Sequence, residues 1–164
     1  GTDSFYISLD DEKLQGIERL NQRFGIAMDA VFTAVYAYIW NQITGENPQL
    51  PWTCCDGCIR IFDCDMDAVE DFDDLFKKAY KGLTSKAFAD EVTFIKREDR
   101  LYFAGGINGK GQIGNFDIFV GITEDENELK ISVHFDTNRV NSDNVRELLG
   151  QTGDVLEYIL NSYS

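Results

Sequence analysis

The sequence is poor in histidine and proline and contains no long apolar run. One histidine, His134, and two prolines occur among the 164 residues, so imidazole catalysis has a single candidate position. No apolar run approaches the roughly 20 residues that a membrane-spanning helix requires, and no N-terminal stretch is typical of a signal peptide. The chain begins Gly1-Thr2-Asp3 without methionine, which we interpret as a piece of a longer polypeptide or the remnant of a cleaved tag.

Basic residues are also scarce, since 15 lysines and arginines stand against 29 acidic side chains and the formal net charge is −14. Such a surface repels phosphate backbones and anionic lipid headgroups, so nucleic acid and membranes are poor partners. Hydrophobic residues at 43% and aromatic residues at 13% predict a single folded domain over 1–164. The four cysteines, without a secretory signal, are expected to be reduced thiols of a cytoplasmic protein.

Two helices are expected in the N-terminal part. Ser8 as N-cap, with Asp11 three residues later, predicts the first helix, and Gly25 provides its left-handed end. The buried stripe of this helix is Leu14, Ile17, Leu20 and Phe24. Asp29 is expected to cap a second helix that Gly45 closes. That helix is apolar nearly all round, so it should be buried on more than one side.

The middle of the chain is predicted to alternate between strands and one further helix. Residues 48–51 form an expected linker between two prolines, and 58–64 is rich in residues that suit a half-buried strand. An apolar stripe over 72–87 predicts the third helix, whose acidic first turn and later lysines complement the helix dipole. Residues 101–104 are a short strand candidate.

The C-terminal part is predicted to be a loop, a hairpin and a helix. Residues 105–114 contain five glycines and are expected to form an exposed loop. Strands over 115–122 and 129–138 flank an acidic turn, and an amphipathic helix follows over 142–163. This order predicts an α/β two-layer sandwich, with a mixed, mostly antiparallel sheet of about 4–5 strands and its helices mainly on one face.

The glycine-rich stretch over 105–114 is a candidate for a phosphate-binding loop. A Walker loop places Gly-Lys-Ser/Thr at the start of a helix, so that backbone amides meet the phosphate. Here Lys110 is followed by Gly111, and the next expected element is a strand. A simple loop is therefore the better interpretation, and no cofactor is assigned.

The cysteines Cys54, Cys55 and Cys58, with Cys64 downstream, contain one C-x-x-C spacing. A closed zinc site needs four ligands, and paired C-x-x-C knuckles are its characteristic signal. A redox C-x-x-C lies at a helix N-terminus, which the strand-like flanks disfavour. We interpret these residues as structural thiols and assign no metal ligand, with a zinc-dependent interaction module as an alternative.

A dense acidic run is a candidate for binding a hard cation. Its members are Asp63, Asp65, Asp67, Glu70, Asp71, Asp73 and Asp74. Calcium loops place a glycine and spaced oxygen ligands at fixed positions, and that pattern is missing. A solvated entry to the third helix is the interpretation we adopt.

Short fragments along nearly the whole chain follow one recognisable order. A helix, a glycine, a long apolar helix and a Thr-Gly ending occupy 20–45, and Asn115-Phe116-Asp117 and 135–141 follow later. This order resembles the C-terminal half of the condensation domains of nonribosomal peptide synthetases, which share a fold with chloramphenicol acetyltransferase. The family's Asn-Thr after the mid-chain glycine is missing here, and the connection before it is shorter.

The family's catalytic motif, HHxxxDG, is absent from this sequence. His134 lacks both the neighbouring histidine and the Asp-Gly, so we interpret it as an incidental strand residue and assign no catalytic residue. The resemblance implies a lobe that is non-catalytic alone and forms a tunnel wall and docking surface in secondary-metabolite peptide synthesis. The implied partners are the N-terminal condensation lobe and peptidyl carrier proteins. The alternative is a small oligomeric acyltransferase that uses His134 as base.

Overall fold

Strands and helices alternate along the chain in the computed structural model, which describes residues 1–84, 100–107 and 116–163. The elements are β1 (Thr2–Leu9), α1 (Asp11–Phe24), α2 (Met28–Thr44), β2 (Gln49–Thr53), β3 (Ile59–Asp63), the 3-10 turn η1 (Met66–Ala68), α3 (Phe72–Leu83), β4 (Phe103–Ile107), β5 (Ile118–Asp125), β6 (Glu128–Asp136) and α4 (Ser142–Ser162). The expected end of the third helix at Ala87 lies outside the described residues.

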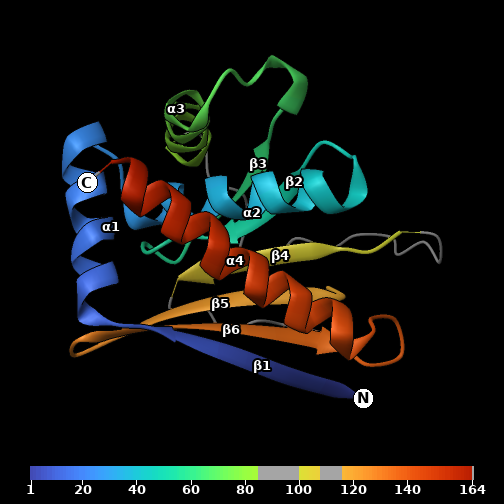
Figure 1. The fold of residues 1–164 in the computed structure, drawn as a ribbon. Helices are drawn as coiled ribbons and strands as arrows, with labels where there is room; N and C mark the ends of the chain where they lie inside the picture. The colour runs from blue at the N-terminus through green and yellow to red at the C-terminus, as the bar shows by residue number, and fades with distance from the viewer. Residues whose placement is uncertain (85–99, 108–115, 164) are drawn as a thin grey trace.

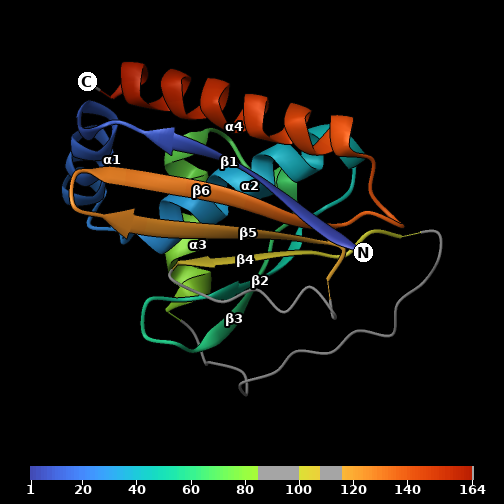
Figure 2. The same cartoon turned by 90° about the horizontal axis from the view of Figure 1, so that it is seen from below.

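The six described strands form one sheet in the order β1-β6-β5-β4-β2-β3. β4 pairs in parallel with β5 and β2, and the other three pairs are antiparallel. The helices pack on one face of this sheet, and the view from below shows the strands in front of them (Figures 1 and 2). The two-layer α/β prediction is confirmed, with six strands because β1 and β2 were not anticipated.

The first strand occupies residues that we had assigned partly to a helix start. Phe5, Ile7 and Leu9 turn toward the core, and β1 pairs over its whole length with β6. Ser8 is therefore a strand residue, and the N-cap of α1 is Asp10, which accepts a hydrogen bond from the Lys13 amide at 3.0 Å. The prediction of Ser8 was wrong because pairing with a distant strand is invisible in the local pattern.

The expected linker over 48–51 is also a strand. Pro51 lies in β2 opposite Ile61 of β3, whereas the parallel ladder to β4 begins only at Trp52. The missing amide hydrogen of Pro51 thus falls outside the β2–β4 ladder, where a proline is tolerated.

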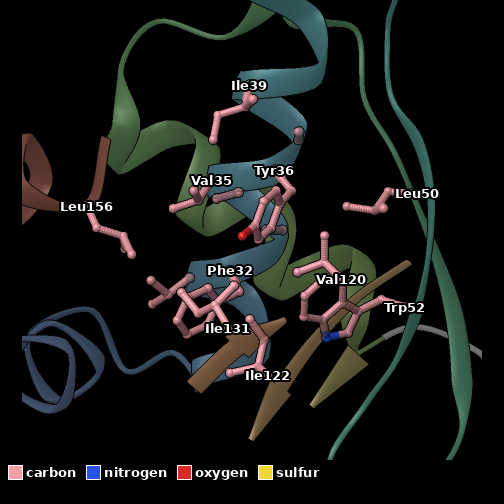
Figure 3. Packing of buried hydrophobic residues seen from close by; sticks show 14 of the residues in the cluster. Phe32, Val35, Tyr36, Ile39, Leu50, Trp52, Val120, Ile122, Ile131 and Leu156 are labelled. Carbon is pink, nitrogen blue, oxygen red and sulfur yellow. The ribbon is translucent and has the colours of Figure 1, made fainter. Parts of the chain in front are cut away.

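The core is centred on α2, which is buried around most of its circumference as predicted. The C-terminal end of α2 also matches the prediction, because Gly45 closes the helix in the left-handed conformation with φ 72°. Large side chains from the helices and the sheet meet beneath α2 (Figure 3). They include Phe32, Tyr36, Trp52, Ile122, Ile131 and Leu156. Each fully buried side chain of this size contributes roughly 1.5–3 kcal/mol of transfer free energy.

Two glycines of the expected loop are instead strand residues. Gly105 and Gly106 belong to β4, where a Cβ atom on Gly105 would lie 2.5 Å from Trp52 Cζ3 and 2.8 Å from the Val120 carbonyl oxygen. These glycines permit close packing between strands rather than loop flexibility. Residues 108–114 of the glycine stretch, including Lys110, lie outside the described residues.

Among the described helices, none is both long and apolar enough to cross a membrane.

Candidate functional site

The two C-terminal fragments of the resemblance meet at a buried ion pair. Asp117, just before β5, has no exposed side-chain surface, and its Oδ1 lies 2.6 Å from Nε of Arg139, which follows β6. The amide of Tyr102 donates to Asp117 Oδ2 at 2.7 Å, and Arg139 Nη2 donates to the Arg100 carbonyl at 2.6 Å. One carboxylate thus joins three segments of the chain at one end of the sheet.

A small cavity opens beside this pair, between the end of α2 and the starts of β2 and β4. Its volume is about 150 Å³, and its lining includes Tyr36, Trp40, Leu50, Arg100, Tyr102 and Phe103. Trp40 stacks on Phe103 with ring centroids 5.1 Å apart, and the Arg100 guanidinium lies 5.7 Å from the Tyr102 ring. The site is therefore an aromatic recess with one cationic side chain in its wall.

His134 lies on the other face of the sheet, away from the helices. Its neighbours Val133 and Phe135 point into the core, whereas His134 is half-buried and stands between Ser4 of β1 and Phe119 of β5 in the strand register. Burial and then the charge of Lys130 lower the pKa of the imidazole below its usual value. Within the described residues no carboxylate hydrogen-bonds to His134, so a catalytic dyad is not formed there.

The same face carries a second, smaller apolar cluster. Its members are Tyr102, Ala104, Phe116 and Phe119. Phe119 alternates along β5 with Ile118 and Val120, which belong to the main core, so its side chain points to the helix-free side. This face of the sheet, on which no described helix packs, therefore carries a buried aromatic cluster and the half-buried single histidine.

Cys54, Cys55 and Cys58 lie around a tight hairpin at the other end of the sheet, whereas Cys64 follows β3 at the far end of the β2–β3 pair. Cys54 N donates to Cys58 O, Gly57 N donates to Cys54 O, both at 2.9 Å, and Gly57 is left-handed with φ 82°. Left-handed glycine after a turn is the usual closure of such a hairpin. Cys54 and Cys64 are buried, Cys58 is intermediate and Cys55 is exposed.

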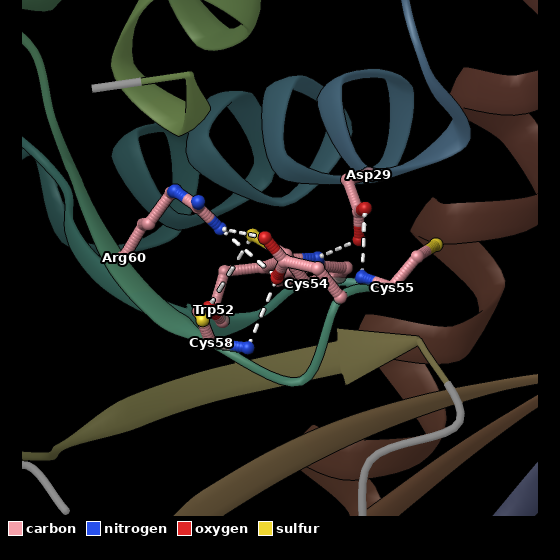
Figure 4. Close-up of polar contacts among 7 residues, drawn as sticks. Asp29, Trp52, Cys54, Cys55, Cys58 and Arg60 are labelled. Atoms are coloured by element: carbon pink, nitrogen blue, oxygen red, sulfur yellow. Dashed lines mark hydrogen bonds and ion pairs between the residues drawn. The ribbon is translucent and has the colours of Figure 1, made fainter. Parts of the chain in front are cut away.

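Asp29 holds this hairpin against α2 rather than capping the helix. The N-cap of α2 is Ala27, and Asp29 in the first turn points toward the hairpin, where Oδ1 accepts from Trp52 Nε1 at 2.7 Å and Oδ2 from the Cys55 amide at 3.1 Å (Figure 4). Beside it, Arg60 pairs with Asp56 at 3.0 Å. The capping prediction was wrong because Trp52, from a later strand, competes for the carboxylate.

The environment keeps three of these thiols, those of Cys54, Cys55 and Cys64, protonated. Burial raises the pKa of Cys54 and of Cys64, and burial followed by the nearby Asp29 carboxylate raises the pKa of Cys55 to about 12. Metal binding requires thiolates. Over the described ranges, no three His, Cys, Asp or Glu side chains are placed to hold a metal ion.

No family model matches the sequence, and no curated protein matches it either. Solved structures do match the fold. The X-domain from teicoplanin biosynthesis superposes with a TM-score of 0.76 at 12% identity, over 98% of this chain and 47% of that one. The epimerization domain from the third module of tyrocidine synthetase B gives 0.72 at 12% identity, over 99% and 48%. The first condensation domain of the CDA synthetase gives 0.66 at 9% identity, over 94% and 44%.

The chain has the fold of one half of a condensation-type domain. It spans less than half the length of each of these three structures, in agreement with the half-domain that the sequence fragments indicated. The resemblance fragments quoted above contain Asp117 and Arg139, but no spacing rule pairs two residues 22 positions apart. That pair, and the Asp29–Trp52 contact, were therefore missed from sequence.

Proposed function

We propose that the chain acts as the non-catalytic C-terminal lobe of a condensation domain in nonribosomal peptide synthesis. It would form one wall of the tunnel between two lobes and a docking surface for carrier proteins. The observation that carries the proposal is the fold itself: nearly the whole chain matches about half of each related domain. The side of the sheet on which no described helix packs is the surface that supports a wall role, and the buried cluster of Tyr102, Phe116 and Phe119 stiffens it.

The histidine content and the surroundings of His134 support a lobe that needs a partner for catalysis. The chain has one histidine and no HHxxxDG motif, and His134 has no orienting carboxylate among the described residues. A general base has to lie within hydrogen-bond reach of its substrate and is normally oriented by a second group. In the proposal, the N-terminal lobe contributes that base.

A reconstitution experiment tests the proposal. The chain is mixed with two carrier proteins loaded with aminoacyl groups, with and without an N-terminal condensation lobe that carries HHxxxDG, and products are followed by mass spectrometry. We expect amide formation only when both lobes are present, binding of the chain to the lobe or to a carrier in calorimetry, and no effect of His134→Ala. Amide formation by the chain alone would refute it, as would a failure to bind either partner.

A second candidate is the oligomeric acyltransferase with His134 as base. The observation in its favour is the lowered pKa of His134, because a base must be neutral at working pH. Light scattering and acyl-coenzyme A hydrolysis by the wild type and His134→Ala decide the matter. An inactive monomer rules this candidate out.

A further inference from the structure

A groove on the outer side of the helical layer has an apolar floor and an acidic rim. It lies between α2, η1 and the start of α3, with a volume of about 190 Å³. Its floor consists of half-buried Tyr38, Met66, Val69 and Phe72 above the buried Leu75. In Figure 1 the start of α3 and the chain before it lie above α2, whereas β4, β5, β6 and β1 lie below it, so the groove is separate from the face of the sheet on which no described helix packs.

Local hydrogen bonds hold the walls of the groove in place. The amide of Met66 donates to Asn47 Oδ1 at 3.0 Å, which ties η1 to the loop after α2. Asp65 caps η1, and Asp71 caps α3 by accepting from the Asp74 amide at 2.8 Å. The groove is therefore formed before any partner arrives, which lowers the ordering cost of binding.

Aromatic rings extend the floor toward α4. Tyr38 and Phe72 have ring centroids 5.1 Å apart, and Phe72 lies 6.2 Å from Tyr158. The Tyr158 side chain is 63% exposed, so its ring is accessible to a partner at the edge of the floor. Ring faces of this kind attract cationic side chains.

The rim carries charge of one sign. Residues 63–74 include seven acidic side chains and no basic one, and Asp65, Asp67, Glu70 and Asp71 are all exposed. In the described part of the chain, the ion pair of this stretch is Asp74 with Lys78 at 2.6 Å. An anionic partner would be repelled here, and a cationic one attracted.

We propose that this groove, defined by Tyr38, Met66, Val69, Phe72 and Leu75 with its acidic rim, binds a basic amphipathic helix of a partner protein. Apolar side chains of that helix would occupy the floor, and its lysines or arginines would face Asp67 and Glu70. A helix that lays its apolar face into a groove is a common recognition mode. The negative charges of the rim favour a partner helix that carries positive charge. This inference does not depend on the proposed function.

A peptide series tests the groove. The probe is a short fluorescent helical peptide of leucine, lysine and alanine with one apolar face, and binding is measured by anisotropy. Two matched peptides replace every lysine with glutamate, or every leucine with serine. We expect only the first peptide to bind, with an affinity that falls as salt screens the rim.

Matched variants of the chain locate the site. Asp67→Lys/Glu70→Lys reverses the rim, whereas Asp125→Lys/Glu126→Lys makes the same change in net charge at the exposed β5–β6 turn. We expect the rim variant to lose affinity by about tenfold or more, as removal of close charge complementarity implies, and the turn variant to lose much less. Circular dichroism confirms that both variants are folded.

The inference would be overturned by absence of binding of the basic amphipathic peptide, by equal loss of affinity in the two variants, or by equal binding of the glutamate peptide. A dimer of the chain in light scattering that the rim variant dissociates would also overturn it, because the groove would then hold a second copy.

Discussion

Asp117 and Asp29 are buried carboxylates at opposite ends of the parallel strands, and the protein satisfies them in different ways. Asp117 precedes β5 and faces the guanidinium of Arg139, whereas Asp29 reaches the hairpin after β2 and accepts only neutral donors. The first contact joins segments around residues 100, 117 and 139, and the second fixes one hairpin on one helix. A charged partner makes the first contact costly to break, because its loss leaves a charge behind.

The largest effect is expected from breaking the ion pair. Asp117→Ala should lower the free energy of unfolding by about 3 kcal/mol, toward the lower end of the range for a buried pair that loses one partner, since Arg139 keeps 23% side-chain exposure. Urea denaturation measures the change. As a control, Asp143→Ala removes a partner from the exposed Arg146 pair and should cost less than about 1 kcal/mol. Equal losses in the two variants would contradict the difference in burial.

Removal of the second carboxylate should cost less. Asp29→Ala leaves the buried Trp52 indole N–H without its acceptor, for about 1–3 kcal/mol, and the Cys55 amide loses its partner as well. Trp52→Phe removes the donor instead. Because the double variant leaves neither group unsatisfied, its loss should be smaller than the sum of the single losses. Strict additivity in urea denaturation would show that the two residues do not interact.

The packing beside Trp52 gives a third effect, no larger than the second. Gly105→Ala should destabilise the chain by about 1–3 kcal/mol through overpacking, since its Cβ would meet Trp52 and the Val120 carbonyl. The matched change is Gly150→Ala in α4, where no heavy atom lies within 4 Å, and a gain of about 0.5–1 kcal/mol is expected from helix propensity. Thermal unfolding compares the two variants. A neutral Gly105→Ala would mean that the strands separate readily.

The smallest effect concerns reactivity rather than stability. Cys55 is exposed, but a pKa of about 12 keeps its thiol protonated, so alkylation by iodoacetamide at pH 8 should be slower than for an ordinary thiol. Asp29→Asn removes the neighbouring charge and should speed the reaction, because a carboxylate disfavours the thiolate. Peptide mapping by mass spectrometry assigns the rate to Cys55. An unchanged rate in Asp29→Asn would contradict an effect of the carboxylate on this thiol.

The helices were predictable because their signals are local. The apolar stripe from Leu14 to Phe24 and the stripe of α3 recur at helical spacing, and α2 is a long run of apolar residues between helix signals. Gly25 and Gly45 end their helices as expected. β1 and β2 are different. β2 is short and contains Pro51, and both β1 and β2 are strands because they pair with partners far along the chain.

The candidate functional residues show the same difference between local signals and long-range contacts. The cysteine spacing and the single histidine were visible in the sequence, but their surroundings were not. Whether His134 faced the core or the open side of the sheet depended on the register of β6 with β1 and β5, since a shift of one residue would reverse it.

The sequence by itself determined the helical layer, the terminal hairpin and the acidic surface, because periodicity, turn residues and charge act over a few neighbouring positions. Only the tertiary structure decided which strands pair and that Asp117 forms an ion pair with Arg139. It also decided that Asp29 accepts a hydrogen bond from Trp52, and that the Trp52 ring packs against the backbone of Gly105. Those contacts join residues that are distant in the chain, and their energies arise from burial and close packing once the sheet has brought the partners together.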